Sequence, residues 1–202
     1  MLGPSAWRRF EQSSEVVVFG SMSAGLDMPD SDMDVLCIGG NEFKLKTDAL
    51  DLIVTSAAST ENGTWLESEL ASHVAKYGTW IKGSPSQWTR NVRVGPRAIA
   101  EKRRRVSAFM RALPGSWSKL EECFRAKYST KLRREIQRLL LLERSVPIPP
   151  TRLLDYSWAS MSKSPTELHE RLRQLTSTPL SSFTNDLFAR LDAHFRVSHP
   201  PM

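Results

Sequence analysis

The sequence predicts an α+β protein, with strands and helices in an N-terminal domain and an all-helical C-terminal domain. Short β-branched or apolar runs bounded by glycine occur in the first 85 residues, whereas helical periodicity dominates after about residue 92. The segment 83–87, with its Gly, Ser and Pro residues, marks the expected boundary. At 202 residues the chain is long enough for two small domains, which we place at residues 1–85 and 86–202.

Four strands are expected in the N-terminal domain. The first contains Val16-Val17-Val18 and stops at Gly20, as a buried strand does. A loop rich in Gly, Asp, Pro and Ser separates it from the second, which Gly39-Gly40 closes. The expected strands span residues 15–19, 32–38, 50–55 and 79–81.

Helices are expected before the first strand, between the third and fourth strands, and throughout the second domain. In the longest of them, apolar residues recur mostly every four positions, and Pro147 lies just beyond its end. The expected helices span residues 7–12, 61–76, 97–113 and 117–144, with two short ones near 165–175 and 181–195.

A glycine-serine pair ends the first strand, and two aspartates begin the second after ten intervening residues. Gly20 lets the backbone turn sharply and approach a ligand closely. The Ser21 hydroxyl and neighbouring amides can then donate hydrogen bonds to phosphate oxygens. Ser31, directly before the aspartates, adds another donor. Gly20, Ser21 and Ser31 are therefore candidate nucleotide-binding residues.

Paired carboxylates predict a metal site on the second strand. Asp32 and Asp34 lie on one face because side chains repeat every two residues along a strand, and Mg²⁺ prefers such oxygen ligands. Asp51 opens the third strand and can complete a second metal position and help to deprotonate an attacking hydroxyl. Asp48 competes for this role but lies in the polar loop before the strand. The candidate catalytic and metal-binding residues are Asp32, Asp34 and Asp51.

This pattern resembles the minimal nucleotidyltransferases of the DNA polymerase β superfamily, in particular bacterial and phage members. The resemblance rests on Gly20-Ser21, ten residues, Asp32-Met33-Asp34 and the later Asp51, and it covers roughly the first 85 residues. It implies a small mixed sheet with helices, a Gly-Ser pair that grips the triphosphate, and three aspartates that bind two Mg²⁺ (or Mn²⁺) ions.

The same resemblance implies transfer of a nucleoside monophosphate from a nucleoside triphosphate to a hydroxyl, with release of pyrophosphate. ATP is the expected donor because many relatives are adenylyltransferases. RNA, a protein side chain and a small molecule remain open as acceptors. An antitoxin-type nucleotidyltransferase acting on a partner toxin is an alternative, although the second domain departs from that pattern.

A non-catalytic module that binds nucleic acid or protein is the alternative from another class. The net charge of +6 and pI of about 9.6 fit a polyanionic partner, and equally a basic surplus that only aids solubility. Lys82 is a candidate nucleotide-binding residue, because its side chain could contact the triphosphate. Basic residues also cluster at 102–105 and along the longest helix, where a solvated face is the competing interpretation. That second cluster comprises Lys127, Lys131, Arg133, Arg134 and Arg138.

Several other classes find no support in the sequence. Cys37 and Cys123 occur in unrelated contexts, and the four histidines lack metal-ligand spacing. The longest aliphatic run, 139–142, is far too short to span a bilayer, and no apolar core follows the first ten residues. The expected location is therefore cytoplasmic, with no membrane partner.

Overall fold

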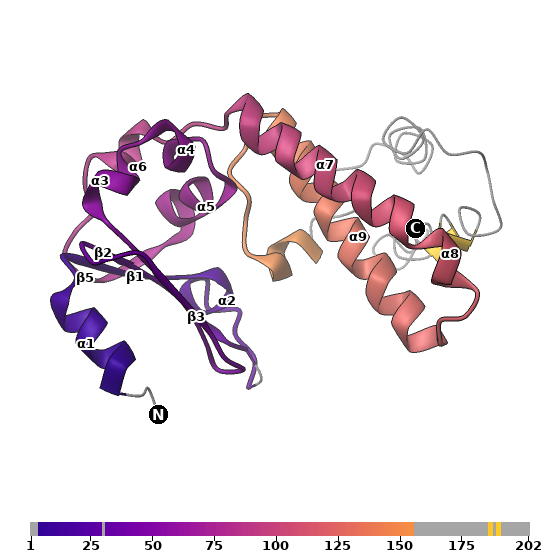
Figure 1. The fold of residues 1–202 in the computed structure, drawn as a ribbon, viewed down its shortest axis with the longest axis horizontal. Helices are drawn as coiled ribbons and strands as arrows, with labels where there is room; N and C mark the ends of the chain where they lie inside the picture. The colour runs from indigo at the N-terminus through magenta and orange to yellow at the C-terminus, as the bar shows by residue number, and fades with distance from the viewer. Residues whose placement is uncertain (1–3, 30, 156–185, 188, 191–202) are drawn as a thin grey trace, which may run out of the picture. The chain divides into compact units, whose positions relative to one another are not determined.

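The computed structural model describes residues 4–29, 31–155, 186–187 and 189–190 (Figure 1). Contacts divide the chain into two compact units, and each is described by itself. Unit 1 comprises Met1–Ala98 with Ser145–Arg152, and unit 2 comprises Ile99–Arg144 with Leu153–Met202. The division into domains at residue 85 stays a prediction.

Unit 1 is built on a mixed sheet, as expected, but the sheet has five strands instead of the four predicted. The order is β3-β4-β2-β1-β5, in which β2 and β4 are parallel and all other neighbours are antiparallel. The strands are β1 (Glu15–Phe19), β2 (Met33–Ile38), β3 (Phe43–Lys46), β4 (Leu50–Thr55) and β5 (Thr79–Lys82).

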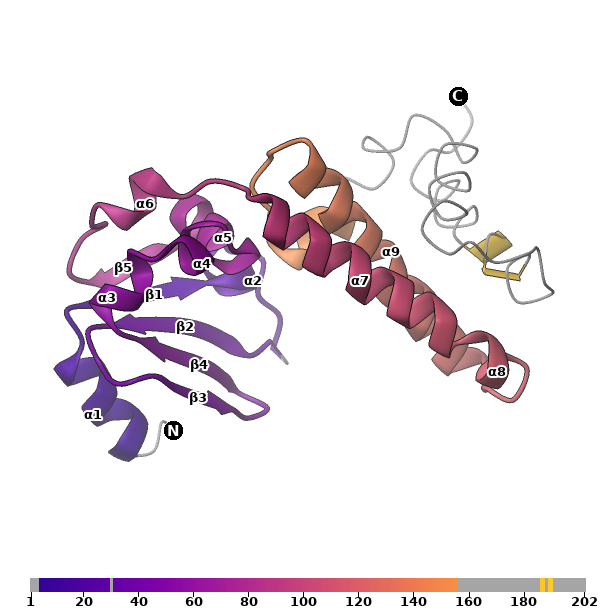
Figure 2. The ribbon, with the colours of Figure 1, turned by 45° about the horizontal axis from the view of Figure 1, so that its top comes forward.

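Helices cover both faces of this sheet, with α1 on one face and α4, α5 and α6 on the other (Figure 2). The helices of unit 1 are α1 (Pro4–Gln12), α2 (Gly20–Ser23), α3 (Ala57–Thr60), α4 (Gly63–Leu66), α5 (Glu69–Tyr77) and α6 (Trp88–Asn91). Three further helices follow, α7 (Pro96–Ala112), α8 (Pro114–Trp117) and α9 (Glu122–Glu143).

Side chains alternate along β2, so that they pack into two separate hydrophobic cores on opposite faces of the sheet. Val35 and Cys37 pack with strand residues and with Phe10 of α1 on one face. Leu36 and Ile38 pack on the other face with residues of α5 and α6. Because side chains repeat every two residues, Asp34 belongs to the second face, at the end of β2 where the apolar cover stops.

The sequence located most strands closely but misjudged two helical regions. β1 and β4 have the expected bounds, whereas β2 begins one residue late and β3 was not predicted. The single helix expected at 61–76 is wrong, because α3 ends before it and two N-caps within it restart the chain as α4 and α5. The capping side chains Ser56, Asn62 and Ser68 accept hydrogen bonds from Ser59, Trp65 and Ala71 amides respectively.

The expected helix 117–144 is shorter in the structure, because α8 ends at Trp117 and α9 begins only at Glu122. The helix expected at 97–113 corresponds to α7. The short helix expected near 165–175 lies outside the described residues, as does most of 181–195; the described Asp186, Leu187, Ala189 and Arg190 are helical.

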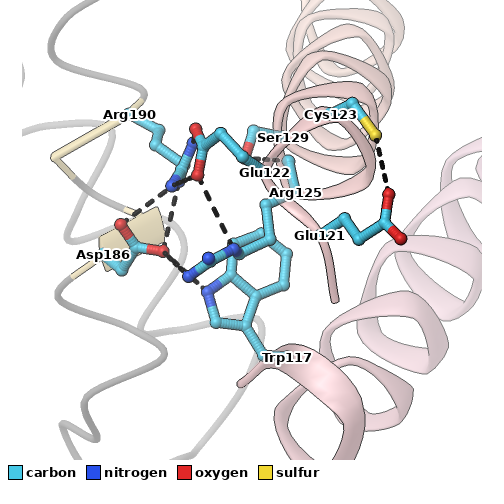
Figure 3. A network of polar contacts seen from close by, with 8 residues as sticks. All are labelled: Trp117, Glu121, Glu122, Cys123, Arg125, Ser129, Asp186 and Arg190. Atoms are coloured by element: carbon cyan, nitrogen blue, oxygen red, sulfur yellow. Dashed lines mark hydrogen bonds and ion pairs between the residues drawn. The ribbon is translucent and has the colours of Figure 1, made fainter. Parts of the chain in front are cut away.

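Unit 2 is helical, as expected, and its core lies between α7 and α9. Val106 and Met110 of α7 pack against Leu132 and Ile136 of α9. A polar network joins the start of α9 to the described residues near 190 (Figure 3). Trp117 donates to Asp186 over 2.8 Å, and Arg190 donates to Asp186 and Glu122.

Many basic side chains of unit 2 form ion pairs with acidic side chains of the same unit. Lys102 is only 2% exposed and pairs with Glu135 at 2.8 Å, while Arg103 pairs with Glu143. Arg133 and Arg134 both bind Asp155. The basic side chains of α9 are therefore largely occupied by intramolecular partners. None of the helices in the described part of the chain is long and apolar enough to cross a membrane.

Candidate active site

Four residues from neighbouring strands form one transverse row across the sheet. Phe19 of β1 lies opposite Asp34 of β2, Asp34 lies opposite Asp51 of β4, and Asp51 lies opposite Lys46 of β3. Residues directly opposite in neighbouring strands project to the same face. The register thus brings Asp34 and Asp51 side by side, although seventeen positions separate them in the sequence.

Asp32 joins this row from the residue just before β2. Asp32, Asp34 and Asp51 each offer a carboxylate oxygen, and these three atoms lie within 4.8 Å of one another. The Asp32 and Asp51 side chains are 37% and 28% exposed, so the cluster is open to solvent on one side. Asp48 is exposed in the turn between β3 and β4 and is not a member of the group. We call these three residues the aspartate triad.

The turn after β1 brings backbone directly against the triad. Gly20 has a φ of +76°, and a Cβ placed on it would lie only 2.1 Å from Oδ2 of Asp34. Any side chain at this position would therefore displace the carboxylate. The buried strand β1 fixes where the turn occurs, and α2 begins at once with Gly20 and Ser21.

Crowding makes the Asp34 carboxylate unfavourable in its charged form. Burial raises the pKa of Asp34 from 3.8 to about 6, and the neighbouring Asp32 and Asp51 charges add to this effect. Among the described residues, no hydrogen-bond donor contacts this carboxylate. A half-buried carboxylate without a donor, between two others, fits an environment completed by a cation.

The triad as a whole fits a divalent metal ion. Its donors are three carboxylate oxygens from adjacent backbone segments, which is the type of ligand that Mg²⁺ and Mn²⁺ take. Three carboxylate oxygens fill only some of the ligand positions of such an ion. Part of the coordination sphere would then remain for water or phosphate oxygens.

Lys46 is a site residue that the sequence analysis did not single out. Its Nζ lies 2.6 Å from Oδ2 of Asp51 and 3.3 Å from Oδ2 of Asp32. The hydrogen bond to Asp51, followed by that to Asp32, raises the pKa of Lys46. A signal was available in the alternation Phe43-Lys44-Leu45-Lys46, which is typical of a half-buried strand preceding the Asp51 strand.

His73 was also missed, and it contacts the turn from α5. Its Nε2 accepts a hydrogen bond from the Gly20 amide at 3.3 Å, and its Nδ1 lies 2.6 Å from the Ile148 carbonyl oxygen. Because a carbonyl only accepts, Nδ1 carries the proton in this arrangement. The ring also meets Phe19 edge-on. A lone histidine in a helix offers no sequence signal for such a contact.

The remaining predicted residues lie in different places. Ser21 is half-buried in α2, directly after Gly20. The Ser31 hydroxyl accepts a hydrogen bond from the Met28 amide within the loop. Lys82 pairs in register with Val16, at the opposite end of β1, and donates to the carbonyls of Phe10 and Glu11. The structure thus does not bring Lys82 to the aspartate triad.

Comparisons with known proteins give two solved structures with low similarity to this chain. No curated protein matches the sequence. A spectinomycin adenyltransferase, AAD(9) from Enterococcus faecialis with ATP and spectinomycin, is similar with a TM-score of 0.46 and 11% identity over 95% of this chain and 94% of that one. A nucleotidyltransferase-like protein from Exiguobacterium sibiricum has a TM-score of 0.43 and 11% identity over 96% of this chain and 72% of that one.

A family model gives the stronger finding. The model described as "Nucleotidyltransferase domain" matches residues 5–111, which is more than half of the chain and includes the sheet, the triad and all but the last residue of α7. This match confirms the resemblance drawn from the sequence. The chain belongs to the nucleotidyltransferase domain family and is a nucleotidyltransferase.

Proposed function

We propose that this nucleotidyltransferase moves a nucleoside monophosphate from a nucleoside triphosphate, with ATP as the expected donor, to an acceptor hydroxyl. The observation that carries the proposal is the convergence of three carboxylates on the Gly20 turn. In the reaction the hydroxyl oxygen forms a bond to the α-phosphorus. The bond from that phosphorus to the bridging oxygen breaks, and pyrophosphate leaves.

Each member of the triad has a distinct role in this proposal. Asp32 and Asp34 hold Mg²⁺ or Mn²⁺, and Asp51 shares in this binding and accepts the proton of the attacking hydroxyl. When bound, the metal neutralises charge on the phosphates and on the entering and leaving oxygens. Burial, and after it the neighbouring Asp32 and Asp51 charges, raise the pKa of Asp34, and a bound cation would offset both effects.

The nucleotide phosphates would lie against the turn after β1. Gly20 lets the backbone lie directly against Asp34, and the Ser21 hydroxyl, which has no hydrogen-bond partner among the described residues, can donate to a phosphate oxygen. Ser31 has a weaker claim because its hydroxyl already accepts a bond from Met28. We leave Lys82 out of the nucleotide site because its ammonium binds the end of α1.

The non-catalytic alternative has less support than the enzyme. It requires basic residues available to a polyanion, yet Arg133 and Arg134 are engaged with Asp155 and Arg138 with Glu135. The antitoxin variant concerns the acceptor and keeps the same site. RNA, protein and small molecules remain the acceptor classes to be distinguished.

Labelling with α-³²P nucleoside triphosphates tests the proposal directly. The protein is incubated with each triphosphate, with Mg²⁺ or Mn²⁺, against total RNA, cell lysate and itself. A labelled product from the wild type that Asp34→Ala abolishes supports transfer, and its sensitivity to nuclease or protease identifies the acceptor class. Asp48→Ala, which changes an exposed aspartate outside the triad, is the matched control. Equal labelling by wild type and Asp34→Ala would contradict the proposal.

A further inference from the structure

The aspartate triad already has a cationic partner within the chain. Lys46 lies at the edge of the sheet, its side chain is 67% exposed, and its ammonium contacts Asp51 at 2.6 Å and Asp32 at 3.3 Å. Its hydrogen bonds and ion pairs within the described part of the chain go to these two aspartates and not to Asp34. The position between the Asp32 and Asp51 carboxylates is thus filled by one positive charge.

We propose that Lys46 is a built-in counter-ion of the triad, which holds Asp32 and Asp51 together without metal and competes with a divalent cation for them. This inference rests on the proposed function, because it assumes that the triad binds the cation. It goes further by assigning to Lys46 a positioning role that limits the affinity for metal.

The ammonium contacts two of the three carboxylates that a metal ion would bind. Metal-oxygen bonds of about 2.0–2.1 Å would draw the Asp32 and Asp51 oxygens closer than they lie to Nζ. An ammonium that stays at 2.6 and 3.3 Å from Oδ2 of Asp51 and Asp32 is close enough to both carboxylates to repel such an ion. Because its side chain is largely exposed, Lys46 can swing away from the strand edge without disturbing the core.

The strand pattern places this lysine specifically. Lys46 pairs with Asp51 across the β3-β4 ladder, whereas Lys44, on the same face of the same edge strand, pairs with Ile53. Two lysines of one strand therefore differ in whether they face a triad member. This difference supplies a matched control.

Manganese binding by the full chain tests the inference, using the loss of the free Mn²⁺ electron paramagnetic resonance signal. We expect Lys46→Met to tighten Mn²⁺ binding about tenfold, since one positive charge next to the ligands is removed. Lys46→Arg, which keeps the charge, and Lys44→Met should both bind as the wild type does. A Lys46→Met variant that binds Mn²⁺ equally or more weakly would overturn the inference.

Thermal unfolding gives an independent reading. Without Lys46 the metal-free triad loses its counter-ion, so in EDTA we expect the Tm of Lys46→Met to lie below that of the wild type. Excess Mn²⁺ should raise the Tm of Lys46→Met by more than it raises the Tm of the wild type. Equal Mn²⁺-induced Tm shifts in the wild type and Lys46→Met would contradict the role of Lys46 but leave the proposed function intact. Absence of Mn²⁺ binding by folded wild type and folded variants alike would defeat the metal site of the proposed function as well.

Discussion

Gly20 and Asp34 are in contact across β1 and β2, and the contact is possible only because Gly20 has no side chain. The Cβ of any other residue would lie 2.1 Å from Oδ2 of Asp34. The positive φ of +76° adds a second reason for glycine at this position. Gly20 is thus required both for its positive φ and for its contact with Asp34, and experiments can separate these two requirements.

We expect Gly20→Ala to displace the Asp34 carboxylate and to abolish nucleotidyl transfer. Gly25→Ala is the matched control, because Gly25 also has a positive φ, of +65°, but nothing lies within 4 Å of its added Cβ. The strain of a positive φ should destabilise each variant by roughly 1–2 kcal/mol in urea unfolding. If Gly25→Ala lost transfer as completely as Gly20→Ala, the contact with Asp34 would not be the cause.

Asp34→Asn is expected to stabilise the metal-free protein while abolishing transfer. In the folded protein the pKa of Asp34 is about 6, compared with 3.8 for an ordinary aspartate. Between these two values the folded state holds a proton that the unfolded chain has released, so the free energy of unfolding falls as the pH rises through this range. At pH 7 the substitution should raise that free energy by on the order of 1 kcal/mol, after allowance for solvent screening.

Urea unfolding in EDTA between pH 4 and pH 7 checks this sign, with Asp48→Asn as the control at an exposed site. The wild type should lose stability across the interval, whereas Asp34→Asn should lose less. An Asp34→Asn variant that is less stable than the wild type at pH 7 would show that the charged Asp34 carboxylate does not destabilise the metal-free fold.

The sequence predicted which residues form the candidate site, but it did not predict the strand pairing that brings them together. The Gly20-Ser21 turn and the pair Asp32 and Asp34 adjoin recognisable strands, and Asp51 opens another. Their alignment depends on parallel pairing between β2 and β4, which is a non-local contact that periodicity does not specify.

Lys46 and His73 show why the rest escaped prediction. Lys46 depends on the register of β3, a four-residue edge strand with only one half-buried position. His73 reaches Gly20 across 53 positions of sequence. The opposite error occurred at Lys82, which was expected at the triphosphate. Because β5 runs antiparallel to β1, Lys82 lies beside Val16, at the end of β1 away from Gly20.

His73 is expected to hold the Gly20 turn in place. His73→Phe removes the hydrogen bonds to the Gly20 amide and the Ile148 carbonyl, and it should destabilise unit 1 by about 1–2 kcal/mol and reduce kcat. His73→Gln, which can still place an acceptor near the former Nε2, should recover more of kcat than His73→Asn does. Steady-state kinetics and urea unfolding separate the two effects, and equal kcat values for the Gln and Asn variants would contradict a role through Gly20.

The buried ion pair of unit 2 should respond unequally to the removal of its two partners. Lys102 is 2% exposed, and Glu135 accepts from both Lys102 and Arg138 at 2.8 Å. Glu135→Gln removes the carboxylate from a buried ammonium and should cost about 3 kcal/mol of unfolding free energy. Lys102→Met should cost less, because Glu135 keeps Arg138 and the methionine refills an apolar site. Chemical denaturation compares the variants, and a larger loss for Lys102→Met than for Glu135→Gln would mean that packing of the lysine stem, rather than its charge, stabilises α7 against α9.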